Sequence, residues 1–296
     1  MIGLETFLAV AAGGIVLGAI YALMAAGLAA IWTTLGIFNF AHGAFIALGA
    51  YIGWTLSNAD AGGMSLAIGV ICAASTMFFF GIVFHLVLVR PFERRTDIVT
   101  ASVITTLAGA AIIESSINLV WGPRSKQLGR LADGKIDLGL VSMPTNDLVL
   151  IGLVAATLAG LGWFLSRTQW GRAMRAVSQN REAAEFMGLD VPRLFALAFG
   201  LSAAMAALAG IFLGGIRFMA PTMGTDPLMK ALIVVIFGGI ARFTSPIYAA
   251  LIIGLVESFS NYFVGLYWTP AVLFTMMIVV LFIKPSGLFG HHQRTL

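Results

Sequence analysis

Two glutamates, Glu114 and Glu257, lie well inside long apolar stretches and are the first candidates for chemistry in this sequence. A carboxylate in such a position is costly toward lipid, so it should face a polar interior or water. An ionised carboxylate there would bind a positively charged group. The competing interpretation is that each glutamate is protonated, or bonded to helix ends, and only holds the helices together.

A second candidate is the stretch Asn-Phe-Ala-His-Gly at 39–43, which brings Asn39 and His42 into another apolar run. Backbone groups released by a broken helix are tolerated at membrane depth only when they are buried in protein or face water. Asn39 and His42 therefore either line a polar cavity or bond to neighbouring helices and hold a break in place.

The segment "GRLADGKI" (129–136) resembles a phosphate-binding loop only superficially. Such a loop needs Ser or Thr after the lysine, a strand before it and a helix after it, whereas Ile136 follows Lys135 and no apolar strand precedes. The single Cys72 cannot form an internal disulfide, and no Cys/His spacing indicates zinc. The sequence thus predicts no cofactor, no metal site and no catalytic residues.

Composition indicates the elements that must position these residues. Of the 296 residues 59% are hydrophobic and 10% charged, against roughly 45–50% apolar and about 25% charged residues in soluble domains. Because a spanning helix needs about 20 apolar residues, we predict an all-α, polytopic transmembrane bundle, one domain over 1–296. The expected hydrophobic segments number about nine, with the seventh short or re-entrant and the second open to a break: 6–32, 36–56, 64–89, 98–121, 147–165, 194–216, 228–241, 245–264 and 268–283.

The basic residues indicate orientation. With nine crossings, eleven Lys and Arg fall on one face and six on the other, and the richer face is expected to be cytoplasmic. This places the N-terminus outside and the C-terminus in the cytoplasm. The richer face includes segment 90–97, the charged stretch 167–193, Arg242 and the tail with Lys284 and Arg294. Membrane orientation explains the basic excess better than a nucleic-acid partner does.

Three pairs of glycines are spaced four apart: Gly14 with Gly18, Gly49 with Gly53, and Gly210 with Gly214. Small residues at this spacing let helices approach closely in a membrane. We favour packing within the chain over a dimer interface for each pair.

The charged stretch contains "SQNREAAEFMGLDVPR" (178–193), which predicts a short polar helix between two spans. Ser178 or Asn180 can cap its start, and Gly188 can end it in the left-handed conformation. Asp190 can cap the next helix, with Pro192 in the first turn. Such a short helix is marginal alone. Its partly apolar face suggests that it is held in a partner's groove: Ala183, Ala184, Phe186 and Met187.

"EAAEFMG" (182–188) resembles the cytoplasmic coupling loop of ABC importer permeases. Four further segments closely resemble the LivH-type branched-chain amino acid permeases, in the same order along the chain: "FNFAHGAFIALGAYIG" (38–53), "GLDVPRLFALAFGLSAAMAALAGIFLGG" (188–215), "VIFGGIARFTSPIYAALIIGLVE" (235–257) and "KPSGLFG" (284–290). One departure is Ala44, where many members of the family carry an acid.

The resemblance implies a permease subunit in the bacterial inner membrane, with the cytoplasmic coupling loop at 167–193. The expected partners are a second, related permease subunit, two ATPase subunits and an extracytoplasmic solute-binding protein. The residues expected to couple to an ATPase are Glu182, Ala183, Ala184 and Gly188.

Four residues are candidates for the translocation path, because each is a polar group inside an apolar run: Asn39, His42, Glu114 and Glu257. An amino acid is zwitterionic, and either glutamate could pair with its ammonium group. One alternative is a permease of the same family for urea, short amides or aromatic acids. Another is a stand-alone secondary transporter or channel that uses Glu114 and Glu257 to bind a coupling ion. An integral membrane enzyme fits least, because no catalytic arrangement is present.

Overall fold

The computed structural model describes residues 3–57, 65–93, 97–137, 142–239 and 244–290. The helices in this part of the chain are α1 (Leu4–Leu35), α2 (His42–Ser57), α3 (Leu66–Phe84), η2 (a π-helix, His85–Val89), η3 (a 3-10 helix, Arg90–Phe92), α4 (Ile98–Trp121), α5 (Thr145–Arg167), α6 (Gln169–Gln179), α7 (Arg181–Phe186), α8 (Val191–Ile216), α9 (Thr225–Gly238), α10 (Ser245–Phe263) and α11 (Thr269–Ile283).

The predicted all-α membrane class is confirmed. Five helical stretches are long and apolar enough to cross a bilayer: α1, α3 with its η2 and η3 extension, α4, α5 and α8. The shorter α2, α9, α10 and α11 coincide with the remaining apolar runs, and the total of nine spans stays a prediction. The polar loop after α4 also contains a small antiparallel hairpin of β1 (Lys135–Asp137) and β2 (Ser142–Pro144), with Ile136 opposite Met143. Lys135 therefore begins a strand, whereas the lysine of a phosphate-binding loop opens a helix.

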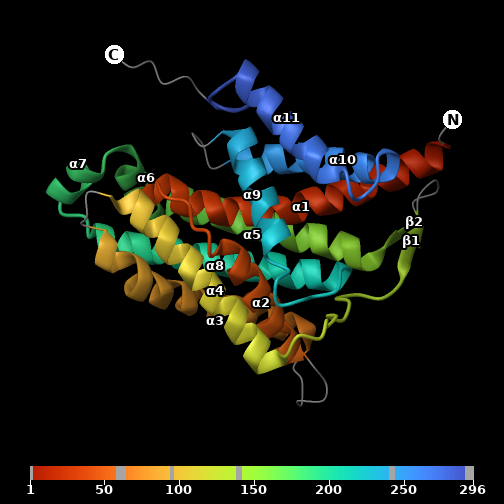
Figure 1. Ribbon diagram of the computed structural model, residues 1–296, viewed down its shortest axis with the longest axis horizontal. Coiled ribbons are helices and arrows are strands. Elements are labelled where there is room, and N and C mark those ends of the chain that lie inside the picture. The colour runs from red at the N-terminus through yellow and green to blue at the C-terminus, as the bar shows by residue number, and fades with distance from the viewer. Residues whose placement is uncertain (1–2, 58–64, 94–96, 138–141, 240–243, 291–296) are drawn as a thin grey trace.

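The helices form an elongated bundle with two distinct ends (Figure 1). The start of α1 and the β1–β2 hairpin lie at one end, and α6 and α7 lie at the other. Arg172, Arg175 and Arg181 belong to α6 and α7, so the arginine-rich segment is far from the hairpin. Four other residues counted for orientation lie outside the described residues: Arg94, Arg95, Arg242 and Arg294.

The core runs along α1, α2 and α8, which are the helices with the most buried side chains. Of the long helices, α8 is the most buried, with 78% of its apolar window buried, whereas the share is 28% for α3, 22% for α4 and 17% for α5. An apolar outer surface is expected of helices that face lipid or another subunit. The central helices therefore carry the internal polar groups, and the outer helices surround them.

Glycines bring the central helices into close contact. A Cβ on Gly210 of α8 would collide with the carbonyl oxygen of Ile46 on α2, and one on Gly49 of α2 would collide with Ala207 of α8. Gly14 and Gly18 of α1 pack in the same way against α10. The predicted packing within the chain is thus confirmed for these glycines, since their close neighbours are backbone and side chains of the same molecule.

We expect Gly210→Ala to destabilise the protein by about 1–3 kcal/mol, the usual effect of overpacking a tight contact. Gly160→Ala on α5 is the matched control, because no atom lies within 4 Å of the position its Cβ would take. Thermal unfolding of the two variants in detergent measures the difference. Equal unfolding temperatures would mean that α8 can move away from α2 at no cost.

Candidate functional site

The charged segment between α5 and α8 is built from local capping bonds. Thr168 caps α6 by accepting a hydrogen bond from the backbone N–H of Gly171, at 3.0 Å. Asn180 caps α7 through the N–H of Ala183, at 2.9 Å. Gly188 then adopts a φ of 82°, and Asp190 caps α8. The predicted caps are confirmed, with Asn180 in that role, but the segment forms two helices where one was expected.

The face of α7 differs from the prediction at one residue. Ala184 is buried in a small apolar cluster with Met174, Val177 and Phe195, and does not belong to the outer face. Phe186 is 91% exposed, and Glu182, Ala183 and Met187 are exposed beside it. One side of α7 therefore holds it to α6 and α8, because Ala184 is small enough to fit there. The other side is an unpartnered surface of mixed apolar and acidic character.

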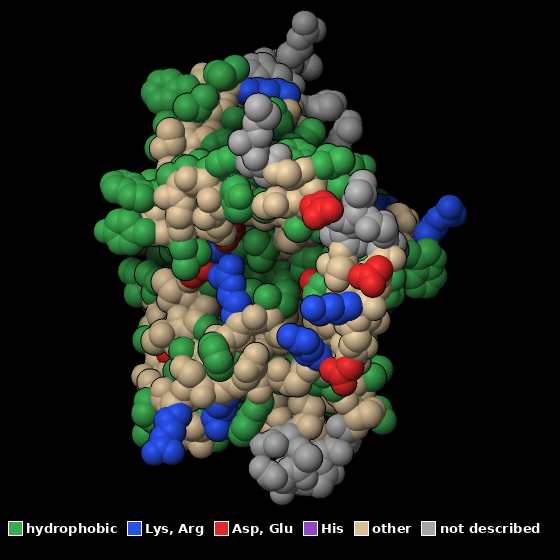
Figure 2. All heavy atoms as spheres, turned by 90° about the vertical axis from the view of Figure 1, so that its right-hand side faces the viewer, with side chains coloured by type: hydrophobic (Ala, Val, Ile, Leu, Met, Phe, Trp, Pro, Cys, Tyr) green, Lys and Arg blue, Asp and Glu red, His purple; other side chains and the backbone are tan. Residues whose placement is uncertain are grey.

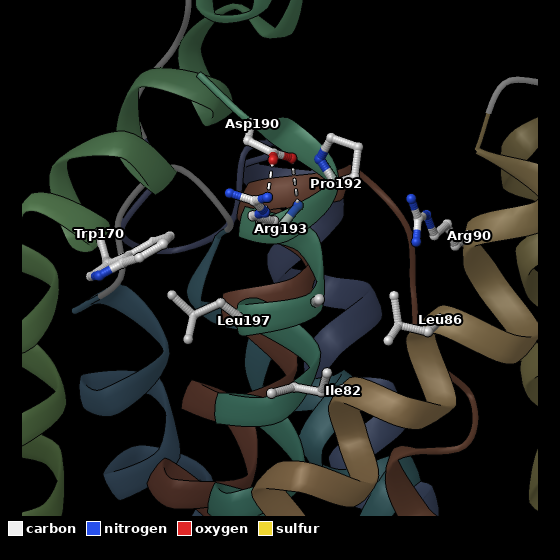
Figure 3. A pocket seen from close by; sticks show the side chains of 9 residues that line it. Ile82, Leu86, Arg90, Trp170, Asp190, Pro192, Arg193 and Leu197 are labelled. Carbon is white, nitrogen blue, oxygen red and sulfur yellow. Dashed lines mark hydrogen bonds and ion pairs between the residues drawn. The ribbon is translucent and has the colours of Figure 1, made fainter. Parts of the chain in front are cut away.

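A cavity of about 500 Å³ adjoins this segment, between the end of α3 and the start of α8. Trp170 of α6 and Leu197 of α8 lie on one side of it, with Leu86 and Arg90 opposite (Figure 3). Arg193 is held by an ion pair of 2.8 Å with Asp190, the residue that caps α8. The first turn of α8 thus joins the charged segment to a groove that is apolar inside and has arginines at its rim.

Asn39 and His42 lie at a break before α2, where residues 37–39 are not helical. His42 is fully buried, with Nδ1 3.1 Å from Ser202 Oγ and Nε2 3.1 Å from the carbonyl oxygen of Met24. Since a carbonyl only accepts, Nε2 carries the proton and Ser202 donates to Nδ1. His42 therefore links α2 to α1 and α8.

Asn39 is also fully buried. Its Oδ1 accepts a hydrogen bond from the backbone N–H of Ala41, at 3.0 Å, while its Nδ2 has no partner among the described residues. Thr106 of α4 accepts from the N–H of Phe40, at 3.3 Å. The break in the chain is thus surrounded by α1, α4 and α8, and both predicted residues face the interior of this subunit.

Glu257 is the centre of a charged cluster that sequence reasoning missed. Its carboxylate accepts hydrogen bonds from Tyr21 Oη and Lys230 Nζ, each at 2.7 Å. Lys230 also pairs with Asp226 at 2.9 Å, and Arg217 lies 3.9 Å from both carboxylates. Two acids and two bases from three parts of the chain, the end of α8, α9 and α10, therefore meet at one place. The sequence feature that pointed to this cluster was Lys230 inside an apolar run, and this feature does not identify the residues that Lys230 contacts.

This cluster lies toward the hairpin end of the bundle. Arg217 directly follows α8, Asp226 is in the first turn of α9, and Met219 bridges to Lys126 in the loop that leads to the hairpin. Figure 2 views this end and shows Lys or Arg and Asp or Glu side chains around a hollow. The charged groups are thus reached from the face opposite α6 and α7.

Glu114 is not part of this cluster. It is half-buried on α4, beside the buried Ile113 and Ile117, and the bonds and ion pairs around Glu257 do not include it. Hydroxyl groups close to the two glutamates bond to backbone carbonyls of the protein. Ser116 bonds to the backbone of its own helix, and Ser258 bonds to the carbonyl oxygen of Val10 on α1.

Apolar spans, a buried polar interior and an exposed charged segment between two spans define a polytopic membrane protein. Residues 10–281 match the family model described as branched-chain amino acid transport system / permease component, and the chain belongs to this family. The predicted resemblance is thereby confirmed over most of the chain.

Several curated relatives align along nearly their whole length. The high-affinity branched-chain amino acid transport system permease protein LivH of Escherichia coli (strain K12) is 28% identical and covers 95% of this chain and 94% of its own. The corresponding protein BraD of Pseudomonas aeruginosa is 24% identical with the same coverage. A probable LivH of Methanocaldococcus jannaschii is 26% identical and covers 94% of this chain and 91% of its own.

The His42 bonds generate a test of its role. Ser202→Ala leaves a buried ring nitrogen without a partner and should cost about 1–3 kcal/mol of stability. Ser116→Ala is the control, because that hydroxyl is exposed and bonds only within its helix. In parallel, cysteine at the buried positions Ala41 or Ala44 should react only slowly with thiol reagents, and equally with and without solute. Protection of either cysteine by solute would contradict a purely structural role and place this break on the path.

Proposed function

We propose that the chain is the membrane-spanning permease subunit of an ABC importer for branched-chain or related amino acids. The observation that carries this proposal is the family match over residues 10–281, supported by relatives of that name that align end to end. A permease for urea, short amides or aromatic acids is the second candidate, favoured by Ala44, where many members of the family carry an acid.

The partners we propose are two ATPase subunits, a second and related permease subunit, and an extracytoplasmic solute-binding protein. The ATPases would dock at the end that carries α6 and α7, and the binding protein at the hairpin end. The arginines of the α6–α7 end favour the cytoplasm for that end. The N-terminus would then be outside and the C-terminus inside the bacterial inner membrane.

We infer that α7 is the element that couples ATP hydrolysis to transport. Its outer face exposes Phe186 and Met187, side chains that contribute large contact areas when a partner covers them. Its inner face packs through Ala184 on Phe195 of α8, and α8 is the most buried long helix of the core. A force on α7 would thus reach the centre of the bundle through one small apolar cluster.

The function is tested by purification and reconstitution. Affinity capture of this chain should also retain an ATPase and a second permease. The reconstituted complex, given its binding protein and ATP, should accumulate leucine, isoleucine or valine. Full transport by this chain alone without ATP would instead establish a secondary transporter, and uptake of amides but not amino acids would establish the second candidate.

We expect Glu182→Lys and Gly188→Val to separate ATP hydrolysis from uptake. The first reverses a charge on the outer face of α7, and the second forces a β-branched side chain into a left-handed backbone conformation (φ 82°). Uptake per ATP hydrolysed should fall about tenfold or more, as expected for the loss of about 1.4 kcal/mol of coupling. The controls at the opposite end are Lys135→Glu and Gly129→Val. Normal uptake by both coupling variants at normal protein levels would remove α7 from this role.

For the path residues we propose unequal roles. The buried bonds of His42 support a role in holding the break before α2, with Asn39 beside it. Of the two candidate acids, Glu257 is held by Lys230 and Tyr21, whereas Glu114 has no cationic partner among the described residues.

Glu114→Gln keeps the shape of the side chain but removes its charge, so uptake should fall if this carboxylate lines the path. An unchanged rate across pH 6 to 8 would leave Glu114 a packing role.

A further inference from the structure

The guanidinium of Arg217 lies between two carboxylates without a hydrogen bond to either. Its nitrogens are 3.9 Å from Asp226 Oδ2 and from Glu257 Oε1, beyond the roughly 2.7–3.2 Å of an N–H···O bond. Lys230, by contrast, reaches the same two carboxylates at 2.9 and 2.7 Å. The planar donor fork of Arg217 is therefore unused by the described part of the chain, and such a fork matches a carboxylate in two-point geometry.

Burial divides the cluster into two pairs. The side chains of Glu257 and Lys230 are 1% and 9% exposed and share a short bond, so they form the buried, fixed part of the cluster. The side chains of Arg217 and Asp226 are 39% and 56% exposed and contact each other only at 3.9 Å, while Asp226 also pairs with Lys230 at 2.9 Å. The accessible part of the cluster is thus one cation and one anion side by side. Exposed pairs of this kind contribute little to stability, so a ligand can separate them at low cost.

An apolar cavity of about 380 Å³ begins at Asp226 and Lys230, the two members of the cluster that line it. Asp226 and Lys230 line its polar side, and its wall consists of Met229, Ile233, Leu273 and Phe274 from α9 and α11. A concave site with an apolar wall and a few convergent polar groups is typical of small-molecule binding. This one combines a charge pair with a space of the size and character that suit an aliphatic side chain.

The charge balance selects the kind of ligand. The cluster contains two acids and two bases, so a simple cation or anion would add an unbalanced charge at a partly desolvated site. A zwitterion adds none, because its carboxylate and ammonium group can each face an opposite charge.

We propose that this cluster and cavity form a transit subsite for a zwitterionic aliphatic amino acid. The ligand's carboxylate binds the fork of Arg217, its ammonium group binds Asp226, and its side chain lies against Ile233 and Phe274. Glu257 and Lys230 act as positioning residues that hold Asp226 in place. The proposal rests on the function proposed above and adds the residues that would recognise the solute at the outer end of the path.

The experiment uses the reconstituted complex of both permeases, the ATPases and the binding protein, with leucine as the probe. Arg217→Gln and Asp226→Asn should each lower leucine uptake per ATP about tenfold, as expected when a charge-assisted hydrogen bond is lost. ATP hydrolysis stimulated by the loaded binding protein and the unfolding temperature should both stay at wild-type values. Arg124→Gln is the matched control, an exposed arginine in the loop on the same side that makes no ion pair with any residue the structure describes. Lys230→Met serves as the contrast, since it leaves Glu257 buried without its cation and should lower the unfolding temperature.

Each outcome has a separate meaning. A wild-type complex that imports no leucine, isoleucine or valine would contradict the proposed function itself. A wild-type complex that imports leucine, with both variants importing it equally well, would overturn only the transit subsite. Uptake that falls together with the unfolding temperature in Arg217→Gln or Asp226→Asn would also overturn it, because the pair would then be structural.

Discussion

The close approach of glycine-bearing helices is the constraint on which the rest of this molecule depends. Apolar side chains gain nothing by leaving lipid for a helix interface, so helices in a membrane associate through tight packing and polar bonds. Here α8 packs on α2 at Gly210 and Gly49, and α1 packs on α10 at Gly14 and Gly18. Larger residues at these positions would separate the backbones and every polar pair between them.

The His42 site and the Glu257 site both follow from these contacts. The α8–α2 contact brings Ser202 to His42, and Gly27 leaves room for the imidazole ring beside α1. The α1–α10 contact brings Tyr21 to Glu257, residues that are 236 positions apart in the chain. The two sites differ in kind. The bonds of His42 are to neutral groups and close a break, whereas Glu257 anchors a charge cluster whose outer members remain accessible.

The two ends of the molecule are suited to different partners. At one end α7 is fixed through Ala184 while Phe186 and Met187 point outward. At the other end charged side chains surround a hollow. An exposed apolar face on a short helix fits a macromolecular partner, and a small hollow with charges at its border fits a solute. The central helix α8 connects them, since it starts at the charged segment and ends next to Arg217.

Local features were readable from the sequence because they act within a few residues. The apolar runs predicted the helices, Asn180 and Asp190 predicted caps, and Gly188 predicted the end of α7, since each bond or φ angle involves near neighbours in the chain. The quoted segments also pointed to the family. The tertiary structure alone decided that Ala184 faces inward, that His42 reaches α1 and α8, and that Glu257 meets Lys230, Arg217 and Asp226. Hydropathy shows only that a carboxylate inside a span needs a partner. Which cation it finds depends on which helices approach closely, and that is set by packing among residues far apart in sequence.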